Sequence, residues 1–127
     1  MKRILIIGSE GYIGTKLGNY LTKKNYFCRG IDTGFFNSGK LSKEIYFNSE
    51  NFDVRMLTKR HLKDIDVVIM LAAISNDPFG NLNPENIYDP TIDYTVKIAS
   101  YCKDLGIKFI FPSSCSVYGF SDSIIDE

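Results

Sequence analysis

The stretch RILIIGSEGYIG, residues 3–14, decides the fold of this chain. A continuous apolar run ends at Gly8, and Gly11 and Gly14 follow at intervals of three residues. Such a run is typical of a strand covered on both faces of a parallel sheet. Glycines directly after the strand allow a tight turn and let backbone N–H groups approach a pyrophosphate at the positive end of the next helix. The stretch therefore predicts a strand, a phosphate-binding turn and a helix.

One acidic residue supports this interpretation. Asp32 ends the next predicted strand, 18 residues after Gly14, where its carboxylate is expected to accept hydrogen bonds from both hydroxyls of an adenosine ribose. The predicted cofactor is NAD, because the charge of Asp32 repels the 2′-phosphate of NADP. Two alternatives are weaker. The glycines could form only a structural turn beside a solvated Asp32. A phosphate-loop NTPase is disfavoured because Thr15 and Lys16 follow Gly14 in the wrong order.

Similar apolar runs recur along the chain, with helix-like segments between them. This alternation predicts an α/β fold, namely a Rossmann-type doubly wound parallel sheet with right-handed crossovers and the strand order 3-2-1-4-5. In the first helix an apolar stripe is expected to face the sheet, and Asn25 to end the helix. The expected strands are 3–8, 26–32, 44–48, 66–73 and 107–114, the expected helices are 12–24, 55–63 and 85–105, and the stripe consists of Ile13, Leu17, Tyr20 and Leu21.

Composition excludes several classes of partner. The 127 residues include 15 basic and 15 acidic side chains, so no field of one sign attracts nucleic acid or an anionic membrane. The N-terminal apolar run is too short for a signal peptide, and nothing approaches the ~20 residues of a membrane span, so a cytoplasmic location is expected. Cys28, Cys102 and Cys115 lack a CxxC spacing and His61 is the one histidine, so we expect buried reduced thiols and no metal site.

Five ordered motifs give the chain a family resemblance: GSEGYIG (8–14), Asp32, DVR (53–55), LAA (71–73) and SSCSVYG (113–119). They resemble the extended short-chain dehydrogenases/reductases, the NAD-dependent sugar epimerase/dehydratase family, whose full-length members act on nucleotide-sugars. Residues 71–89 are similar to a nucleotide-sugar epimerase-like subgroup. The resemblance implies a pyrophosphate site at Gly8, Gly11, Tyr12, Ile13 and Gly14, a ribose site at Asp32, an adenine site at Asp53 and Val54, a groove lined by Leu71, Ala72 and Ala73, and a catalytic hydroxyl on Ser114.

The chain departs from the family pattern in two places. Thr91 stands where members usually carry an asparagine early in the long helix. The catalytic Tyr-x-x-x-Lys of the family lies downstream of VYG, beyond Glu127. Two matches, Tyr12 to Lys16 and Tyr20 to Lys24, fall on the first helix and are expected to be chance. Residues 1–127 are therefore interpreted as an NAD-binding Rossmann domain truncated before the last strands, without the catalytic helix and the substrate domain, and inactive alone.

Two functional hypotheses follow. The first is the NAD-binding portion of a nucleotide-sugar epimerase/dehydratase-like protein. The alternative is a stand-alone dinucleotide-binding module without catalysis, acting as a sensor or regulatory subunit; a purely structural partner subunit is weaker still.

A homo-oligomer is expected because helix 85–105 is apolar on two sides and the sheet can cover only one. One side carries Ile92, Val96 and Ala99, and the other carries Tyr94, Ile98, Tyr101 and Leu105.

Overall fold

The structure of the chain is a computed structural model that describes residues 1–35, 44–73, 84–114 and 119. The described strands form one parallel five-stranded sheet in the order β3-β2-β1-β4-β5, which confirms the predicted topology. The strands are β1 Arg3–Ile7, β2 Phe27–Asp32, β3 Asn48–Asn51, β4 Val67–Met70 and β5 Lys108–Ile110, the helices are α1 Tyr12–Lys23 and α3 Pro84–Leu105, and the 3₁₀ turns are η2 Val54–Met56 and η3 Lys59–Leu62.

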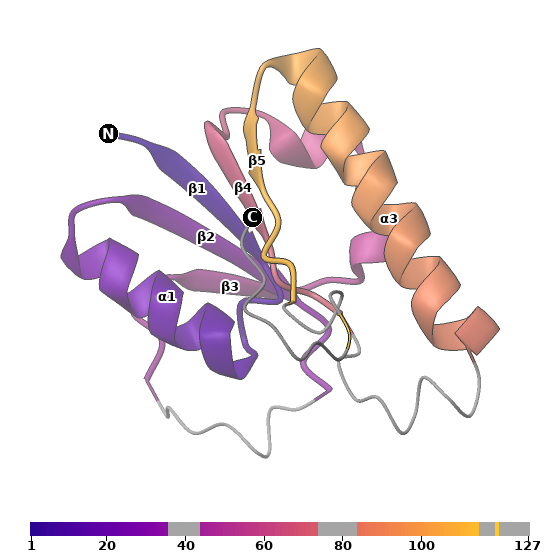
Figure 1. The fold of residues 1–127 in the computed structure, drawn as a ribbon. Coiled ribbons are helices and arrows are strands. Elements are labelled where there is room, and N and C mark those ends of the chain that lie inside the picture. Colours follow the sequence, from indigo (N-terminus) through magenta and orange to yellow (C-terminus); the bar gives the residue numbers. More distant parts are fainter. Residues whose placement is uncertain (36–43, 74–83, 115–118, 120–127) are drawn as a thin grey trace.

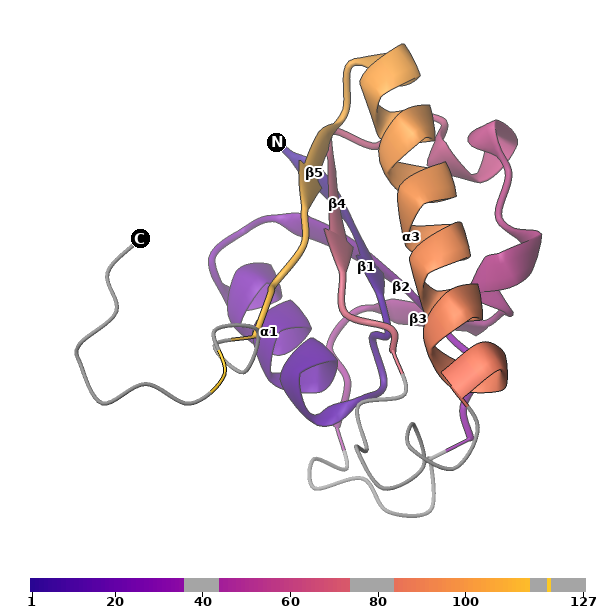
Figure 2. The same ribbon diagram turned by 45° about the vertical axis from the view of Figure 1, so that its right-hand side comes forward.

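The sheet is the middle of three layers. Helix α1 covers one face, and α3 with the two 3₁₀ turns covers the other (Figures 1 and 2). Successive residues of β1 point to opposite faces, so Ile4 and Ile6 pack in the core on the α1 side while Leu5 and Ile7 pack in the core on the α3 side. All four side chains are buried. The continuous apolar run at the start of the chain is therefore a strand covered on both faces, as predicted.

The predicted third strand, 44–48, is wrong, because the strand occupies Asn48–Asn51 and is polar throughout. The reason lies in Phe47. Its ring fills the space that side chains at Gly18 of α1 and Gly30 of β2 would otherwise occupy. Phe47 therefore packs beneath α1 while Tyr46 is 49% exposed, and the chain joins the sheet edge only afterwards, with Asn48 opposite Arg29.

The predicted helix 55–63 is two separate 3₁₀ turns, η2 and η3. A side chain caps the start of each turn: the Asp53 carboxylate accepts the Arg55 N–H at the start of η2, and Thr58 and His61 form a capping box at the start of η3. These local bonds compete with a continuous helical ladder. Leu57, between the turns, and Leu62, at the end of η3, are both buried in the core beneath α3.

Helix α1 contacts the sheet differently from the prediction. Ile13 and Tyr20 are 60% and 58% exposed, while the buried residues of the helix are Gly14, Thr15 and Gly18. Small residues let the helix approach the sheet closely, so only Leu17 and Leu21 of the predicted stripe pack against the core. The predicted helix stop is confirmed, because α1 ends at Lys23 and Asn25 has a positive φ of 63°.

Helix α3 lies within one residue of the predicted range, and the sheet takes only one of its two apolar faces. Ile98 and Cys102 are fully buried, and Tyr94 and Tyr101 pack against the same core. On the other face Val96, like Ile92, is 59% exposed.

Among the described residues no helix combines the length and the apolar character that a membrane crossing requires.

The turn from β1 into α1 brings two backbone segments into close contact. Gly8 has a φ of 87°, and a Cβ there would lie 2.7 Å from the Ala72 backbone nitrogen. A Cβ at Gly14 would overlap the Gly8 carbonyl oxygen. Gly11 differs, because its φ is −70° and the nearest described atom that a Cβ would meet beyond its chain neighbours is the Gly8 oxygen, at 3.5 Å. The fold therefore requires glycine at the first and third positions of the motif but leaves room at the second.

Substituting Gly14→Ala is expected to lower the free energy of unfolding by about 2–3 kcal/mol, because the added methyl group displaces backbone that cannot shift freely. Gly11→Ala is the matched control. We expect its free energy of unfolding to change by less than about 1 kcal/mol. Alanine is a poorer N-cap than glycine, but it also reduces the conformational freedom of the unfolded chain, and the two effects largely offset each other. Chemical denaturation measures both. Equal stability of the two variants would contradict the close contact at Gly14.

Candidate functional site

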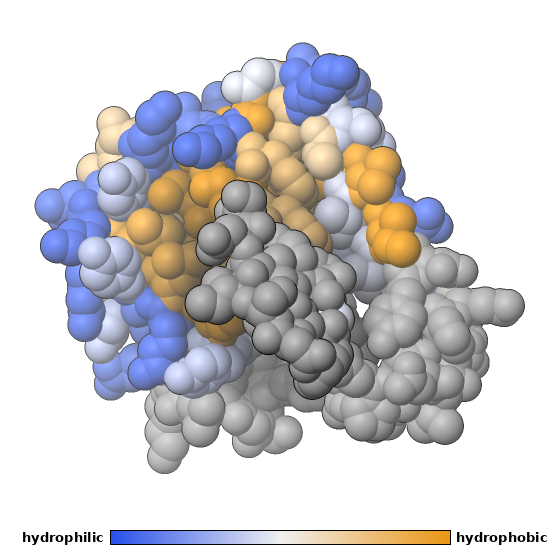
Figure 3. Space-filling model, in the orientation of Figure 1, coloured by the Kyte–Doolittle hydropathy of each residue, from blue (hydrophilic) through white to orange (hydrophobic). Residues whose placement is uncertain are grey.

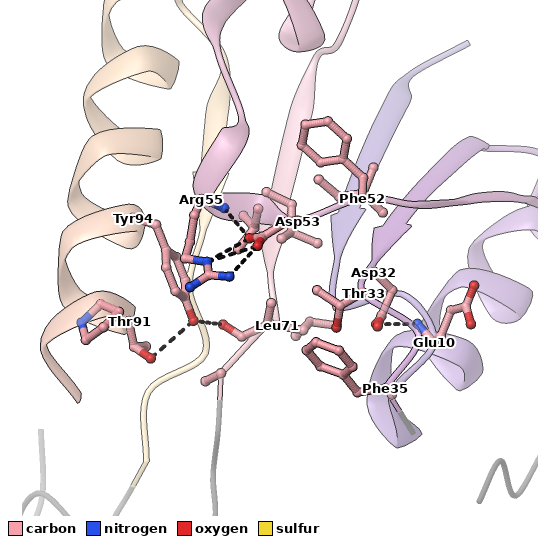
Figure 4. Close-up of a pocket in the computed structure, with 18 residues that line it drawn as sticks. Glu10, Asp32, Thr33, Phe35, Phe52, Asp53, Arg55, Leu71, Thr91 and Tyr94 are labelled. Carbon is pink, nitrogen blue, oxygen red and sulfur yellow. Dashed lines mark hydrogen bonds and ion pairs between the residues drawn. The ribbon is translucent and has the colours of Figure 1, made fainter. Parts of the chain in front are cut away.

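A pocket of about 290 Å³ opens at the carboxyl ends of β1, β2 and β4. Its wall is completed by η2 and by the α3 residues Pro90, Thr91 and Tyr94 (Figure 4). The crossover connections of the sheet diverge between β1 and β4, and open α/β sheets bind ligands at this point. The pocket brings together eight residues predicted from the sequence, namely Gly8, Gly11, Asp32, Asp53, Val54, Leu71, Ala72 and Ala73.

Backbone hydrogen bonds hold the glycine turn against the end of β2. The Gly8 N–H donates to the Ile31 carbonyl oxygen at 2.9 Å. The Glu10 N–H donates to Asp32 Oδ2 at 3.0 Å, and the Gly34 N–H donates to Asp32 Oδ1 at 2.9 Å. Each carboxylate oxygen thus accepts one backbone N–H and keeps further acceptor capacity. Asp32 is thus fixed in the pocket wall with acceptor capacity to spare.

The second glycine of the motif leaves space that the fold does not use. Gly11 lines the pocket, and among the described residues, its two chain neighbours aside, only the Gly8 oxygen would lie within 4 Å of a Cβ there. It is also the N-cap of α1, so the positive end of the helix dipole lies at this place. An open space beside a helix start fits the pyrophosphate of a dinucleotide.

Asp53 and Arg55 form an ion pair in the wall of the pocket (Figure 4). Both the backbone N–H and the guanidinium of Arg55 donate to the Asp53 carboxylate. The hydrogen bonds from the Arg55 side chain lower the pKa of Asp53 below its ordinary value, with a smaller opposing effect of burial. Asp53 is therefore ionised at neutral pH and can only accept hydrogen bonds.

The Tyr94 side chain joins α3 to the end of β4 at the pocket. Its hydroxyl donates to the Ala72 carbonyl oxygen at 3.0 Å and lies 3.2 Å from the Thr91 hydroxyl. Burial raises the pKa of Tyr94, so the phenol is protonated at neutral pH. The sequence placed Tyr94 on an apolar helix face and gave no sign of this bond. Thr91, which stands where the family usually has asparagine, lines the pocket as well.

Sequence reasoning also missed Glu10, Phe35 and Arg55 as pocket residues. Phe35 follows the Asp32 turn and is 81% exposed. The Glu10 carboxylate accepts a hydrogen bond of 2.9 Å from the Ser49 hydroxyl, which ties the glycine turn to the edge strand β3. The sequence hinted at two of these pocket residues only by their position in the chain. Glu10 lies inside the glycine motif, and Arg55 directly follows the predicted Asp53–Val54 pair.

The remaining predicted site residues lie outside the lining of the pocket. Tyr12 and Ile13 begin α1 and are mostly exposed, and Gly14 is buried in the contact with Gly8. Ser114 is exposed and follows the end of β5 by four residues. The two Tyr-x-x-x-Lys matches lie on or at the end of α1, where Lys24 stacks on the ring of Tyr20 with 5.7 Å between Nζ and the ring centroid.

The described cysteines are structural. Cys28 and Cys102 are buried free thiols, and Cys115 lies outside the described residues. Burial raises the pKa of Cys102 to about 11 and also raises that of Cys28. Both are protonated at neutral pH, and a protonated thiol is a poor nucleophile.

Comparison with known proteins points to one family. The sequence profile of the NAD dependent epimerase/dehydratase family matches residues 4–127. An NAD-dependent NDP-hexosamine 5,6-dehydratase of tunicamycin biosynthesis is 26% identical, with a TM-score of 0.84 over 96% of this chain and 40% of that chain. The UDP-N-acetylglucosamine 4-epimerase of Methanobrevibacter ruminantium M1, solved with UDP-N-acetylmuramic acid, is 25% identical, with a TM-score of 0.86 over 99% of this chain and 42% of that one.

A third solved structure is similar in fold. The UDP-glucose-4-epimerase from Stenotrophomonas maltophila, solved with bound NAD and formylated UDP-arabinopyranose, is 21% identical, with a TM-score of 0.82 over 97% of this chain and 40% of that one. The chain thus spans about two-fifths of the length of these proteins.

Replacing Tyr94 by Phe is expected to lower the free energy of unfolding by about 1 kcal/mol, because the Ala72 carbonyl loses its hydrogen bond in a partly buried place. Tyr101→Phe is the control, since Tyr101 packs against the same core about two turns further along α3. Thermal or chemical denaturation compares the two variants. If Tyr101→Phe lowered the free energy of unfolding as much as Tyr94→Phe, a specific hydrogen bond from Tyr94 to the end of β4 would be contradicted.

Proposed function

Because the chain belongs to the NAD dependent epimerase/dehydratase family, we propose that it binds NAD(H) in the pocket of Figure 4 and is the NAD-binding portion of a nucleotide-sugar epimerase or dehydratase. One observation carries the proposal: the open space at Gly11 and the fixed carboxylate of Asp32 lie in the wall of one pocket. The first suits a pyrophosphate, and the second suits ribose hydroxyls.

Each part of the dinucleotide has a place in this proposal. Backbone N–H groups of Tyr12 and Ile13 at the start of α1 bind the pyrophosphate beside Gly11, with the help of the helix dipole. Asp32 accepts hydrogen bonds from the adenosine ribose. Asp53 and Val54 bind the adenine, and Leu71 to Ala73 line the groove beneath the cofactor. When bound, NAD supplies a hydride acceptor, and the protein orients it.

The proposed substrates are nucleotide-sugars, and Ser114 is the proposed hydrogen-bond partner of the sugar hydroxyl that is oxidised. The support is indirect: the similar proteins are described as NDP-hexosamine and UDP-sugar enzymes, and this chain matches their first two-fifths. The alternative of a stand-alone dinucleotide-binding module gains no support over this proposal from the comparisons.

Association of two copies through the outer face of α3 is part of the proposal. Ile92 and Val96 are each 59% exposed on a helix whose opposite face is buried against the sheet. Figure 3 shows apolar side chains on the outer side of α3. Covering such a face removes apolar area from water, so a symmetric dimer is expected.

Wild-type protein is expected to bind NAD⁺ at least about fivefold more tightly than NADP⁺, because repulsion between Asp32 and a 2′-phosphate ~4 Å away costs ~1 kcal/mol even at the dielectric constant of water. Asp32→Ala should abolish the preference. Asp104→Ala, which removes an exposed carboxylate paired with Lys59, is the control and should preserve it. Titration calorimetry measures the affinities. Equal or tighter binding of NADP⁺ by the wild type would reject the assignment of Asp32.

Val96→Glu is expected to shift the dimer to monomer, because an ionised carboxylate would have to be buried in the interface. Lys103→Glu, an exposed change near the end of the same helix, is the control and should leave the dimer intact. Size-exclusion chromatography with light scattering gives the molar mass. A wild-type protein that is monomeric at millimolar concentration would refute this interface.

A further inference from the structure

Side-chain hydrogen bonds tie the glycine turn to the edge strand β3. The Ser49 hydroxyl donates to Glu10 Oε1 at 2.9 Å, and its oxygen lies 2.8 Å from the hydroxyl oxygen of Ser9. Because the one hydroxyl proton of Ser49 goes to the carboxylate, Ser9 is the donor in the second bond. The bonds therefore run in one direction, from Ser9 through Ser49 to Glu10, and such a chain of bonds is strengthened by mutual polarisation.

The neighbouring strands hold the two hydroxyls in place. Ser9 is fully buried, and a Cβ at Gly30 of β2 would lie only 2.4 Å from its hydroxyl oxygen, so glycine at that position makes room for Ser9. Ser49 stands opposite Gly30 in the parallel register of β2 and β3. The polar sequence of β3 thus places a hydroxyl beside the glycine turn, which an apolar edge strand would lack.

Glu10 brings a negative charge next to the proposed pyrophosphate site. It directly precedes Gly11, the N-cap of α1, and it lines the same pocket. The positive end of a helix dipole attracts a side-chain carboxylate as well as a phosphate. A Glu10 side chain turned toward the start of α1 would therefore compete with a pyrophosphate and repel it. In the structure the carboxylate is instead bonded to Ser49, and Figure 4 shows it on the far side of Asp32 from Tyr94.

We propose that Ser49 is a positioning residue that holds the Glu10 carboxylate away from the pyrophosphate site. Its hydroxyl acts through Glu10 and is not itself a ligand of the cofactor. The inference rests on the proposed binding of NAD(H) in this pocket, and it adds a residue of the edge strand that controls the affinity of the site for phosphate groups.

The experiment is a double-mutant cycle on the affinity for NAD⁺, measured by titration calorimetry on the wild type, Ser49→Ala, Glu10→Gln and the double variant. Ser49→Ala releases the charged side chain and is expected to weaken binding about fivefold, the effect of one like charge ~4 Å away in water. Glu10→Gln keeps the size of the side chain without its charge, so its affinity should equal or exceed that of the wild type. In the Glu10→Gln background, Ser49→Ala should then change the affinity by less than about twofold.

Two further measurements separate the effect of charge from a merely structural role. Ser100→Ala removes an exposed hydroxyl that donates to the Val96 carbonyl oxygen on α3, and it should leave the affinity for NAD⁺ unchanged. Raising the salt concentration from about 0.01 M to about 1 M shortens the Debye length from about 30 Å to about 3 Å, so the loss in Ser49→Ala should shrink to less than about twofold. A loss caused by distorted packing would persist at high salt.

The outcomes distinguish this inference from the proposed function. If the wild type does not bind NAD⁺, the proposed function fails and the inference fails with it. If the wild type binds NAD⁺ and Ser49→Ala binds it equally well, the function stands and the role of Ser49 is overturned. The same conclusion follows if the loss in Ser49→Ala is as large in the Glu10→Gln background or at high salt. Glu10→Gln leaves β3 untouched, so weaker binding by this single variant also overturns the inference. Thermal unfolding of each variant establishes that folded protein is titrated.

Discussion

The closest backbone contact in the motif joins the end of β1 to the first turn of α1. The Gly8 carbonyl lies where a Cβ of residue 14 would be, so the helix can sit this close to the sheet only with glycine at that place. The same contact sets the position of the turn between them, whose N–H groups bond to the end of β2 and fix Asp32. The pocket then forms where the ends of β1, β2 and β4 meet. The geometry of the candidate site therefore depends on the packing of two glycines.

Much of the fold was predictable because the buried strands leave a strong pattern. The run that becomes β1 is apolar on both faces since α1 and α3 cover both, and the same holds for β4. The edge strand β3 was misplaced because its sequence, NSEN, has no apolar signal, and because Phe47 packs under α1 rather than in the sheet. The helix predicted over 55–63 failed for a local reason, since the side chains of Asp53 and Thr58 divert the backbone hydrogen bonds.

The site was predictable where a motif fixes the backbone, and less so where a long side chain reaches in from another layer. Gly8, Gly11 and Asp32 line one pocket as expected, because their spacing follows the strand–turn–helix geometry itself. Helical periodicity places Tyr94 on one of two apolar faces of the helix but decides neither which face the sheet covers nor that the Tyr94 hydroxyl meets the Ala72 carbonyl. The binding roles of the motif residues, and that of Ser114, stay predictions.

The central claim is that the three glycines of the motif have different tasks: Gly8 and Gly14 serve the fold, and Gly11 keeps space for the pyrophosphate. The most direct test is the dissociation constant of NAD⁺ for Gly11→Ala, measured by titration calorimetry beside that of the wild type. We predict that the added methyl group weakens binding at least about tenfold, a loss of ~1.4 kcal/mol, in a protein that still folds. An unchanged affinity of folded Gly11→Ala for NAD⁺ would contradict this account of the pocket.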